Sequence, residues 1–160
     1  MIAEPWARSP GVRVPPPLIY AAAGLVAWYL NTRLGFTIDG SGAGLIQRVL
    51  GWLFTAAGVA LVAGGLRTLS VSHTTFDPNG HAANLVVSGP YRWTRNPIYL
   101  GFSATFFGIT LLVNSGWMIV LLPIVMMIMS GAVIRREELH LSAVFGADYV
   151  QYARRVRRWL

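Results

Sequence analysis

Long stretches without a charged residue dominate the chain and alternate with short segments that carry arginine. Three such stretches are long enough to cross a bilayer as helices: Val14–Thr32, Val49–Leu66 and Asn96–Ile134. The first two have 19 and 18 residues, close to the roughly 20 that span the hydrocarbon core. The third has 39 residues and as one straight helix would measure about 58 Å, twice the core thickness. It must therefore fold back on itself.

The middle of the third stretch carries the residues of a turn, Asn114-Ser115-Gly116. Asparagine, serine and glycine favour tight turns, so we expect a hairpin of two helices here. The segment after the hairpin, residues 135–160, predicts an amphipathic helix with a break near Gly146. The pattern as a whole predicts an all-α fold. We expect one membrane-embedded domain over residues 1–160, a polytopic membrane protein with about four transmembrane helices plus a C-terminal amphipathic cytoplasmic helix.

Composition supports a bilayer as the surroundings of the chain. The sequence is 54% hydrophobic and only 12% charged, which is too apolar for an ordinary soluble domain. Zero cysteine excludes disulfides and thiolate chemistry. All 13 basic residues are arginine, and against 6 acids they leave a net charge of +7. That charge suits anionic headgroups, and beside an apolar chain we favour lipid over nucleic acid as the partner.

The arginines also predict an orientation. Eleven fall on one side of the four-helix topology, and only Arg33 and Arg48 fall on the other. Arginine concentrates on the cytoplasmic side of membrane proteins. We therefore expect a multi-pass protein of the cell membrane with both termini in the cytoplasm.

Small residues in the second predicted helix suggest how the helices pack. Ala56, Ala60 and Gly64 recur at four-residue spacing, which lets another helix approach closely. We expect this stripe to pack inside a monomer, in preference to forming a homodimer.

The polar residues capable of chemistry form two clusters, one before the third helix (Tyr91, Arg92, Arg95, Asn96 and Tyr99) and one after the fourth (Arg135, Arg136, Glu137 and Glu138). An antiparallel hairpin returns its two ends to the same depth, so the clusters should be neighbours. We expect Arg95 and Glu138 to share a cavity there. The alternative is that these residues only anchor the helices and form ion pairs at the membrane border.

The order of motifs resembles a known family. The block "LVVSGPYRWTRNPIYLG", residues 85–101, is followed about 35 residues later by "EELHLSAVFGADYVQYARRV". Together they resemble the isoprenylcysteine carboxyl methyltransferase and phospholipid methyltransferase superfamily of integral membrane enzymes. Asn96 departs from the pattern, because many members have histidine there. Asparagine keeps donor and acceptor groups that can orient a cofactor, but it does not titrate near neutral pH. Whether Asn96 replaces a catalytic histidine or only orients the cofactor stays open.

The resemblance implies methyl transfer from S-adenosylmethionine, giving S-adenosylhomocysteine, to a lipophilic or membrane-associated acceptor. Residues 70–99 and 135–160 would form the cytoplasmic catalytic parts. By resemblance, the residues at the reacting end are Arg95, Asn96 and Tyr99. The residues that bind the cofactor would be Val87, Gly89, Tyr91, Arg95, Pro97, Glu137, Glu138 and Tyr152. The acceptor stays open among an isoprenylcysteine-type carboxylate, a phospholipid amine and a small lipophilic molecule.

Other functions are weighed against this interpretation. A membrane reductase using a nicotinamide cofactor and a non-catalytic transport or assembly module remain alternatives. The glycine-rich run Asp39–Leu45 lacks the strand and helix of a Rossmann loop, so we interpret it as a connection. His73, His81 and His140 match no helical metal pair, and we expect no metal site.

Overall fold

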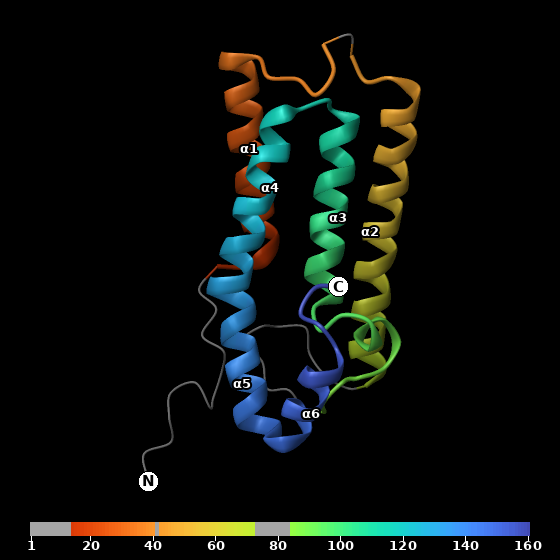
Figure 1. Cartoon of the computed structure of the whole chain (residues 1–160), viewed down its shortest axis with the longest axis vertical. Coiled ribbons are helices and arrows are strands. Elements are labelled where there is room, and N and C mark those ends of the chain that lie inside the picture. The colour runs from red at the N-terminus through yellow and green to blue at the C-terminus, as the bar shows by residue number, and fades with distance from the viewer. Residues whose placement is uncertain (1–13, 41, 73–83) are drawn as a thin grey trace.

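Helices make up the regular structure of the described residues, which in this computed structural model are 14–40, 42–72 and 84–160. Their order is α1 (Pro16–Leu34), α2 (Leu45–Val71), η2 (Gly89–Arg92), α3 (Pro97–Leu112), α4 (Gly116–Ile128), η3 (Met129–Ile134), α5 (Arg135–Phe145) and α6 (Ala147–Arg155). Figure 1 shows α1 to α4 side by side in a bundle, with α5 continuing below α4 and α6 turning back beneath α3. The all-α prediction is thus confirmed for these residues.

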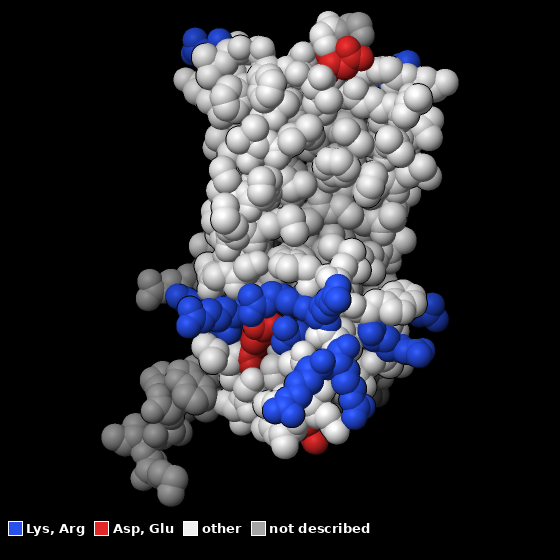
Figure 2. Space-filling view, viewed as in Figure 1, with Lys and Arg blue, Asp and Glu red and all other residues white. Residues whose placement is uncertain are grey.

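Among the described residues, two helices are long and apolar enough to cross a membrane. They are α2, with 27 residues, and the continuous helix Gly116–Phe145, with 30 residues. About 20 residues cross the hydrocarbon core, so the second helix can span it by Arg135 and carry the rest of α5 into the polar region. Figure 2 shows the matching surface, an uncharged belt between a few charges at one end and many at the other. The chain is therefore a helical membrane protein, whereas its four-span topology stays a prediction.

The predicted turn joins α3 to α4. Asn114 adopts a left-handed conformation with φ 54°, and its side-chain amide donates to the Asp39 carbonyl at 2.8 Å. Gln47 of α2 donates in turn to the Asn114 side-chain oxygen at 3.0 Å. The Ser115 hydroxyl then caps α4 by accepting from the Met118 backbone N–H. The hairpin prediction is confirmed, and the turn is tied to both neighbouring segments.

The lower half of the long helix changes its winding. Residues Met129–Ile134 form the π-helix η3, whose wider turns occur mostly as short insertions, often at functional sites. α5 follows without interruption and ends at Phe145. Gly146, with φ 54°, separates α5 from α6, which confirms the predicted break. The winding of η3 therefore sets the direction of the side chains on α5.

Close backbone contact joins α2 to α3. A Cβ atom on Gly58 would lie 2.6 Å from the Gly101 carbonyl oxygen and 2.6 Å from the Thr105 backbone nitrogen. A Cβ atom on Gly108 would lie 2.6 Å from the Gly51 carbonyl oxygen. Glycine spaced by seven residues on both helices thus removes the side chains that would hold the backbones apart.

The stripe predicted from Ala56, Ala60 and Gly64 was wrong. Ala56 and Ala60 are exposed, whereas Gly51, Gly58 and Gly65 are buried against α3. Alanine lets two helices approach closely, but the backbones of α2 and α3 are so close that no Cβ atom fits between them. The glycine face of α2 therefore packs against α3.

Gly58→Ala is expected to lower stability by about 3 kcal/mol, because the new methyl group meets backbone atoms that cannot move aside. Thermal unfolding in detergent measures the effect. Gly24→Ala is the matched control, since its Cβ would meet only Phe106 at 4.0 Å. Equal melting temperatures for the two variants would contradict the glycine contact.

Candidate functional site

The arginine-rich end of the bundle brings the two polar clusters together. Arg95 lies between η2 and α3, and Glu138 lies in the first turn of α5. The Arg95 Nη1 and Glu138 Oε1 atoms are 3.1 Å apart, and both side chains are only 16% exposed. The prediction that Arg95 and Glu138 are neighbours is therefore confirmed. Because the ion pair is buried, removing one partner would leave the other charge unpaired and would destabilise the fold.

A second arginine holds the same carboxylate. The Arg158 Nε donates to Glu138 Oε1 at 3.0 Å, and its Nη2 donates to Oε2 at 2.5 Å. Such a two-point contact is the strong form of an arginine–carboxylate pair. Glu138 thus joins the start of α3 to the segment Val156–Leu160, which we call the strap.

The side chain of Asn96 binds the backbone of the strap. Its Nδ2 donates to the Arg158 carbonyl at 2.9 Å, and the Thr94 hydroxyl donates to the same oxygen at 3.0 Å. The Arg95 backbone N–H donates to the Arg157 carbonyl at 2.9 Å. Asn96 is buried. Its amide therefore acts here as a donor that fixes the strap against the start of α3.

The strap also reaches the π-helix. The Trp159 indole N–H donates to the Ser130 hydroxyl at 3.2 Å, and the ring packs against the buried core. A partly buried tryptophan with its N–H satisfied is a strong apolar anchor. The strap is thus fixed at both α3 and η3.

Glu137 points to a different partner from its neighbour Glu138. The Tyr99 hydroxyl donates to Glu137 Oε1 at 2.5 Å. Burial raises the pKa of Glu137 to about 7, the Tyr99 hydrogen bond opposes this rise, and the charge of Glu138 adds to it. Glu137 can therefore gain or lose a proton near neutral pH.

Two tyrosines join η2 to α6. The Tyr152 hydroxyl donates to the Tyr91 carbonyl at 2.8 Å. Burial raises the pKa of both phenols above the ordinary value, with the charge of Glu137 contributing at Tyr91. Both therefore remain neutral hydrogen-bonding groups at physiological pH.

The remaining predicted residues differ in placement. Gly89 has φ 56°, and a Cβ there would lie 2.6 Å from the Thr68 hydroxyl, so glycine lets η2 sit against α2. Pro97 is buried as the first residue of α3. Val87 has an exposed side chain. Part of the predicted connection 70–99, residues 73–83 with His73 and His81, lies outside the described residues.

The sequence interpretation missed the residues of the strap. Arg158 is one of four arginines in the last seven residues, and nothing in their order marks which one meets Glu138. Tyr149 was quoted within the family block but given no role. Its hydroxyl lies 3.5 Å from Arg95 Nη1, and the residue is 4% exposed.

The donor set fits the amino-acid end of S-adenosylmethionine. An ammonium or ribose hydroxyl suits the carboxylate of Glu137, and a carboxylate suits Arg95, whose Nε is buried without a hydrogen-bond partner. Glu138 already receives two guanidinium groups. Glu137 and Arg95 are therefore the residues with capacity to hold the cofactor.

Comparison with known proteins agrees with this chemistry. The phospholipid methyltransferase family matches residues 46–148. The protein-S-isoprenylcysteine O-methyltransferase of Saccharomyces cerevisiae is 32% identical over 113 residues, 65% of this chain and 47% of the yeast protein. The chain thus spans about half the length of that relative, and no solved structure gives a significant match. The family match covers α2 through α5, more than half of the chain, and the chain belongs to the phospholipid methyltransferase family.

Proposed function

We propose that the protein transfers a methyl group from S-adenosylmethionine to a lipophilic acceptor at the arginine-rich end of the bundle. The observation that carries this proposal is the convergence of Arg95, Tyr99 and Glu137 at the end of an apolar helical bundle. Membership of a family that uses S-adenosylmethionine supports it. The proposed topology has four spans with both termini and the site in the cytoplasm. The cofactor then arrives from water and the acceptor from the bilayer.

Positioning is the main task of the residues in this reaction. The sulfonium of S-adenosylmethionine supplies an electrophilic methyl group, so the protein needs little covalent chemistry of its own. Glu137 holds the ammonium or the ribose hydroxyls, and Tyr99 orients Glu137. Arg95 holds an anionic group of the cofactor or acceptor, while the packed strap keeps water from the reacting end. Fixing reactants in line can supply several kcal/mol of rate enhancement, up to about 11.

Glu138 and Asn96 act on the site through Arg95 and the strap. Glu138 directs the Arg95 guanidinium, and Asn96 fixes the strap that brings Arg158 to Glu138. We propose both as positioning residues. The remaining proposed cofactor contacts are the backbone of Val87 and Gly89, the ring of Pro97, Tyr91 and Tyr152.

The acceptor is proposed only as a class. A lipophilic molecule with a nucleophilic carboxylate, amine or thiol is compatible with the site. The yeast relative is named for isoprenylcysteine, and the family for phospholipid. All of these candidate acceptors are lipophilic and would enter the site from the lipid bilayer.

A labelled-methyl assay tests the function. The purified protein in lipid nanodiscs is incubated with S-adenosylmethionine carrying tritium in its methyl group, and a membrane lipid extract is added as acceptor. We expect label in the lipid-extractable fraction and a melting temperature raised by the cofactor, since a ligand of the folded state stabilises it. NADPH oxidation without label would indicate a reductase. The absence of both label transfer and NADPH oxidation would indicate a non-catalytic module.

Cofactor affinity is expected to fall as pH drops below about 7, where Glu137 becomes protonated. Each further pH unit lowers the carboxylate fraction about tenfold. Glu137→Gln should bind weakly with no such pH dependence, as calorimetry between pH 5.5 and 8.5 can measure. Asp148→Asn, at an exposed position in the first turn of α6, serves as the charge-matched control. A variant with the affinity and pH profile of the unmodified protein would remove Glu137 from the site.

Asn96→Ala is expected to lower kcat about tenfold, because the Arg158 carbonyl loses one of its two side-chain donors. The KM for S-adenosylmethionine should change less. Asn31→Ala, in α1, is the matched control. Asn96→His separates positioning from proton transfer: a positioning role gives no new inflection in the pH–rate profile. A new inflection near pH 6.5 accompanied by a higher rate would contradict it.

A further inference from the structure

A basic cleft lies beside the cofactor residues, between α5, α6 and the strap. It has a volume of about 490 Å³, and its polar lining includes Arg95, Arg135, Glu138, Ser142, Arg154 and Arg158. This volume is within the roughly 300–1,000 Å³ of small-molecule sites. Of the residues proposed to contact the cofactor, only Arg95 lines it, together with the positioning residue Glu138. The cleft is therefore largely separate from the site around Glu137 and Tyr99.

The charge of the cleft exceeds what its own residues neutralise. Its lining contributes four arginines and one glutamate. The glutamate, Glu138, is already shared by Arg95 and Arg158. Within the described part of the chain, Arg135 and Arg154 have neither an ion pair nor a side-chain hydrogen bond. Two guanidinium groups thus remain available to an external anion.

The form of these donors favours phosphate. A guanidinium presents a planar fork that matches two oxygens of one phosphate group, and an arginine pair can hold such a group from two sides. The Ser142 hydroxyl in the same lining adds a neutral donor. A tetrahedral oxyanion would satisfy this set better than a single carboxylate.

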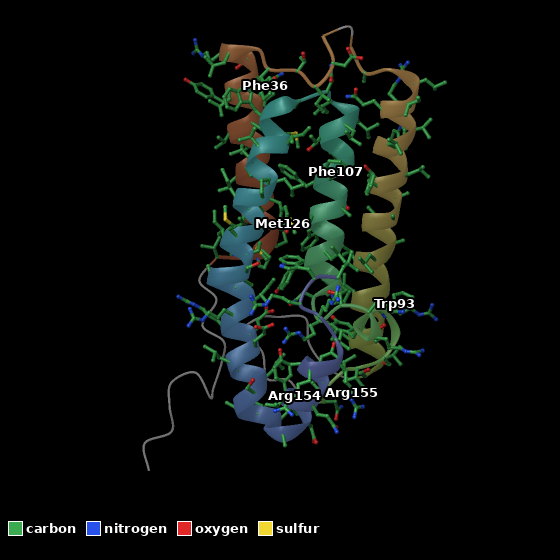
Figure 3. The ribbon with its side chains drawn as sticks, viewed as in Figure 1. Phe36, Trp93, Phe107, Met126, Arg154 and Arg155 are labelled. Atoms are coloured by element: carbon green, nitrogen blue, oxygen red, sulfur yellow. The ribbon has the colours of Figure 1, made fainter. Side chains whose placement is uncertain are left out.

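The position and the apolar lining favour a lipid as the source of that phosphate. Figure 2 shows the arginine-rich surface directly below the uncharged belt, at the level where headgroups lie. Figure 3 shows Arg154 and Arg155 on α6 at this end of the bundle. Leu139 and Val150, both in the lining, are 55% and 44% exposed. Exposed apolar side chains beside arginine suit a ligand with a phosphate and an apolar glycerol or acyl portion.

We propose that this cleft binds the phosphate group of an anionic membrane phospholipid through Arg135 and Arg154. The lipid is a bound ligand with its own site, whether or not methyl transfer occurs. The bound phosphate neutralises the excess charge of the cleft and holds α5 against α6. Binding of the cofactor at Glu137 is a separate event.

Binding of a short-chain lipid tests the proposal. The full chain in a neutral detergent is titrated with dioctanoyl phosphatidylglycerol, and the Kd is measured by calorimetry and by the shift in melting temperature. Dioctanoylglycerol, which lacks the phosphate, and inorganic phosphate form the comparison arms. We expect saturable binding of the phospholipid and weaker or no binding in the other two arms. Inorganic phosphate binding as tightly as the phospholipid would overturn the lipid assignment.

Paired variants locate the binding. Arg135→Gln/Arg154→Gln should weaken phospholipid binding at least about tenfold, since two charge-assisted contacts are lost. Arg67→Gln/Arg155→Gln is the matched control, because it removes the same charge from exposed positions outside the cleft. Equal losses in both pairs would show a non-specific charge effect and overturn the proposal.

Two further measurements keep the outcome decisive. If the first pair does not fold, Ala153→Asp places a carboxylate in the cleft and should abolish phospholipid binding. Retained binding in that variant would contradict the proposal. S-adenosylmethionine affinity in Arg135→Gln/Arg154→Gln should stay within about twofold, because neither arginine is a cofactor residue. Competition between the two ligands would assign the cleft to the cofactor and overturn the lipid site, while leaving methyl transfer intact.

Discussion

A single carboxylate organises the arginine-rich end of this protein. Glu138 receives Arg95 from the start of α3 and Arg158 from the strap, so three segments distant in sequence meet at two oxygen atoms. Two guanidinium partners compensate the carboxylate for its loss of water, and removing either one would leave charge poorly paired. The strap's remaining contacts, at Asn96 and Ser130, depend on the position that this ion cluster sets.

The adjacent residues Glu137 and Glu138 have different partners because successive helical residues point about 100° apart. Glu138 forms ion pairs with Arg95 and Arg158, which compensate its charge. Glu137 faces Tyr99, is poorly solvated and has a pKa close to neutral. The same residue type thus gives one carboxylate held by two arginines and another whose pKa burial raises to about 7. Only the second has free capacity for a cationic ligand, so the cofactor contact proposed at Glu137 is distinct from the supporting role proposed for Glu138.

The sequence was informative where polarity changes sharply along the chain. Uncharged lengths and the Asn114-Ser115-Gly116 turn predicted the hairpin, and the hairpin placed Arg95 near Glu138. It was misleading about α2, because spacing identifies small residues without saying which face meets a neighbour; glycine contact with α3 decides that. Arg158 could not be chosen among its neighbouring arginines, since the strap's path depends on tertiary hydrogen bonds.

The π-helix η3 has a consequence for how this end of the molecule tolerates changes in length. Six residues wind there with a wider turn than the helices before and after them. Deleting one residue from η3 would let the backbone relax to ordinary α winding and would leave the downstream helix close to its present direction, whereas deleting one residue from α4 would rotate everything downstream by about 100°. After the deletion in α4, but not after the deletion in η3, Glu137 and Glu138 would each face the wrong neighbour. The wide turn of η3 can therefore absorb a one-residue change in length. The contacts of Glu137 and Glu138 depend on the register of the α-helical turns that precede them.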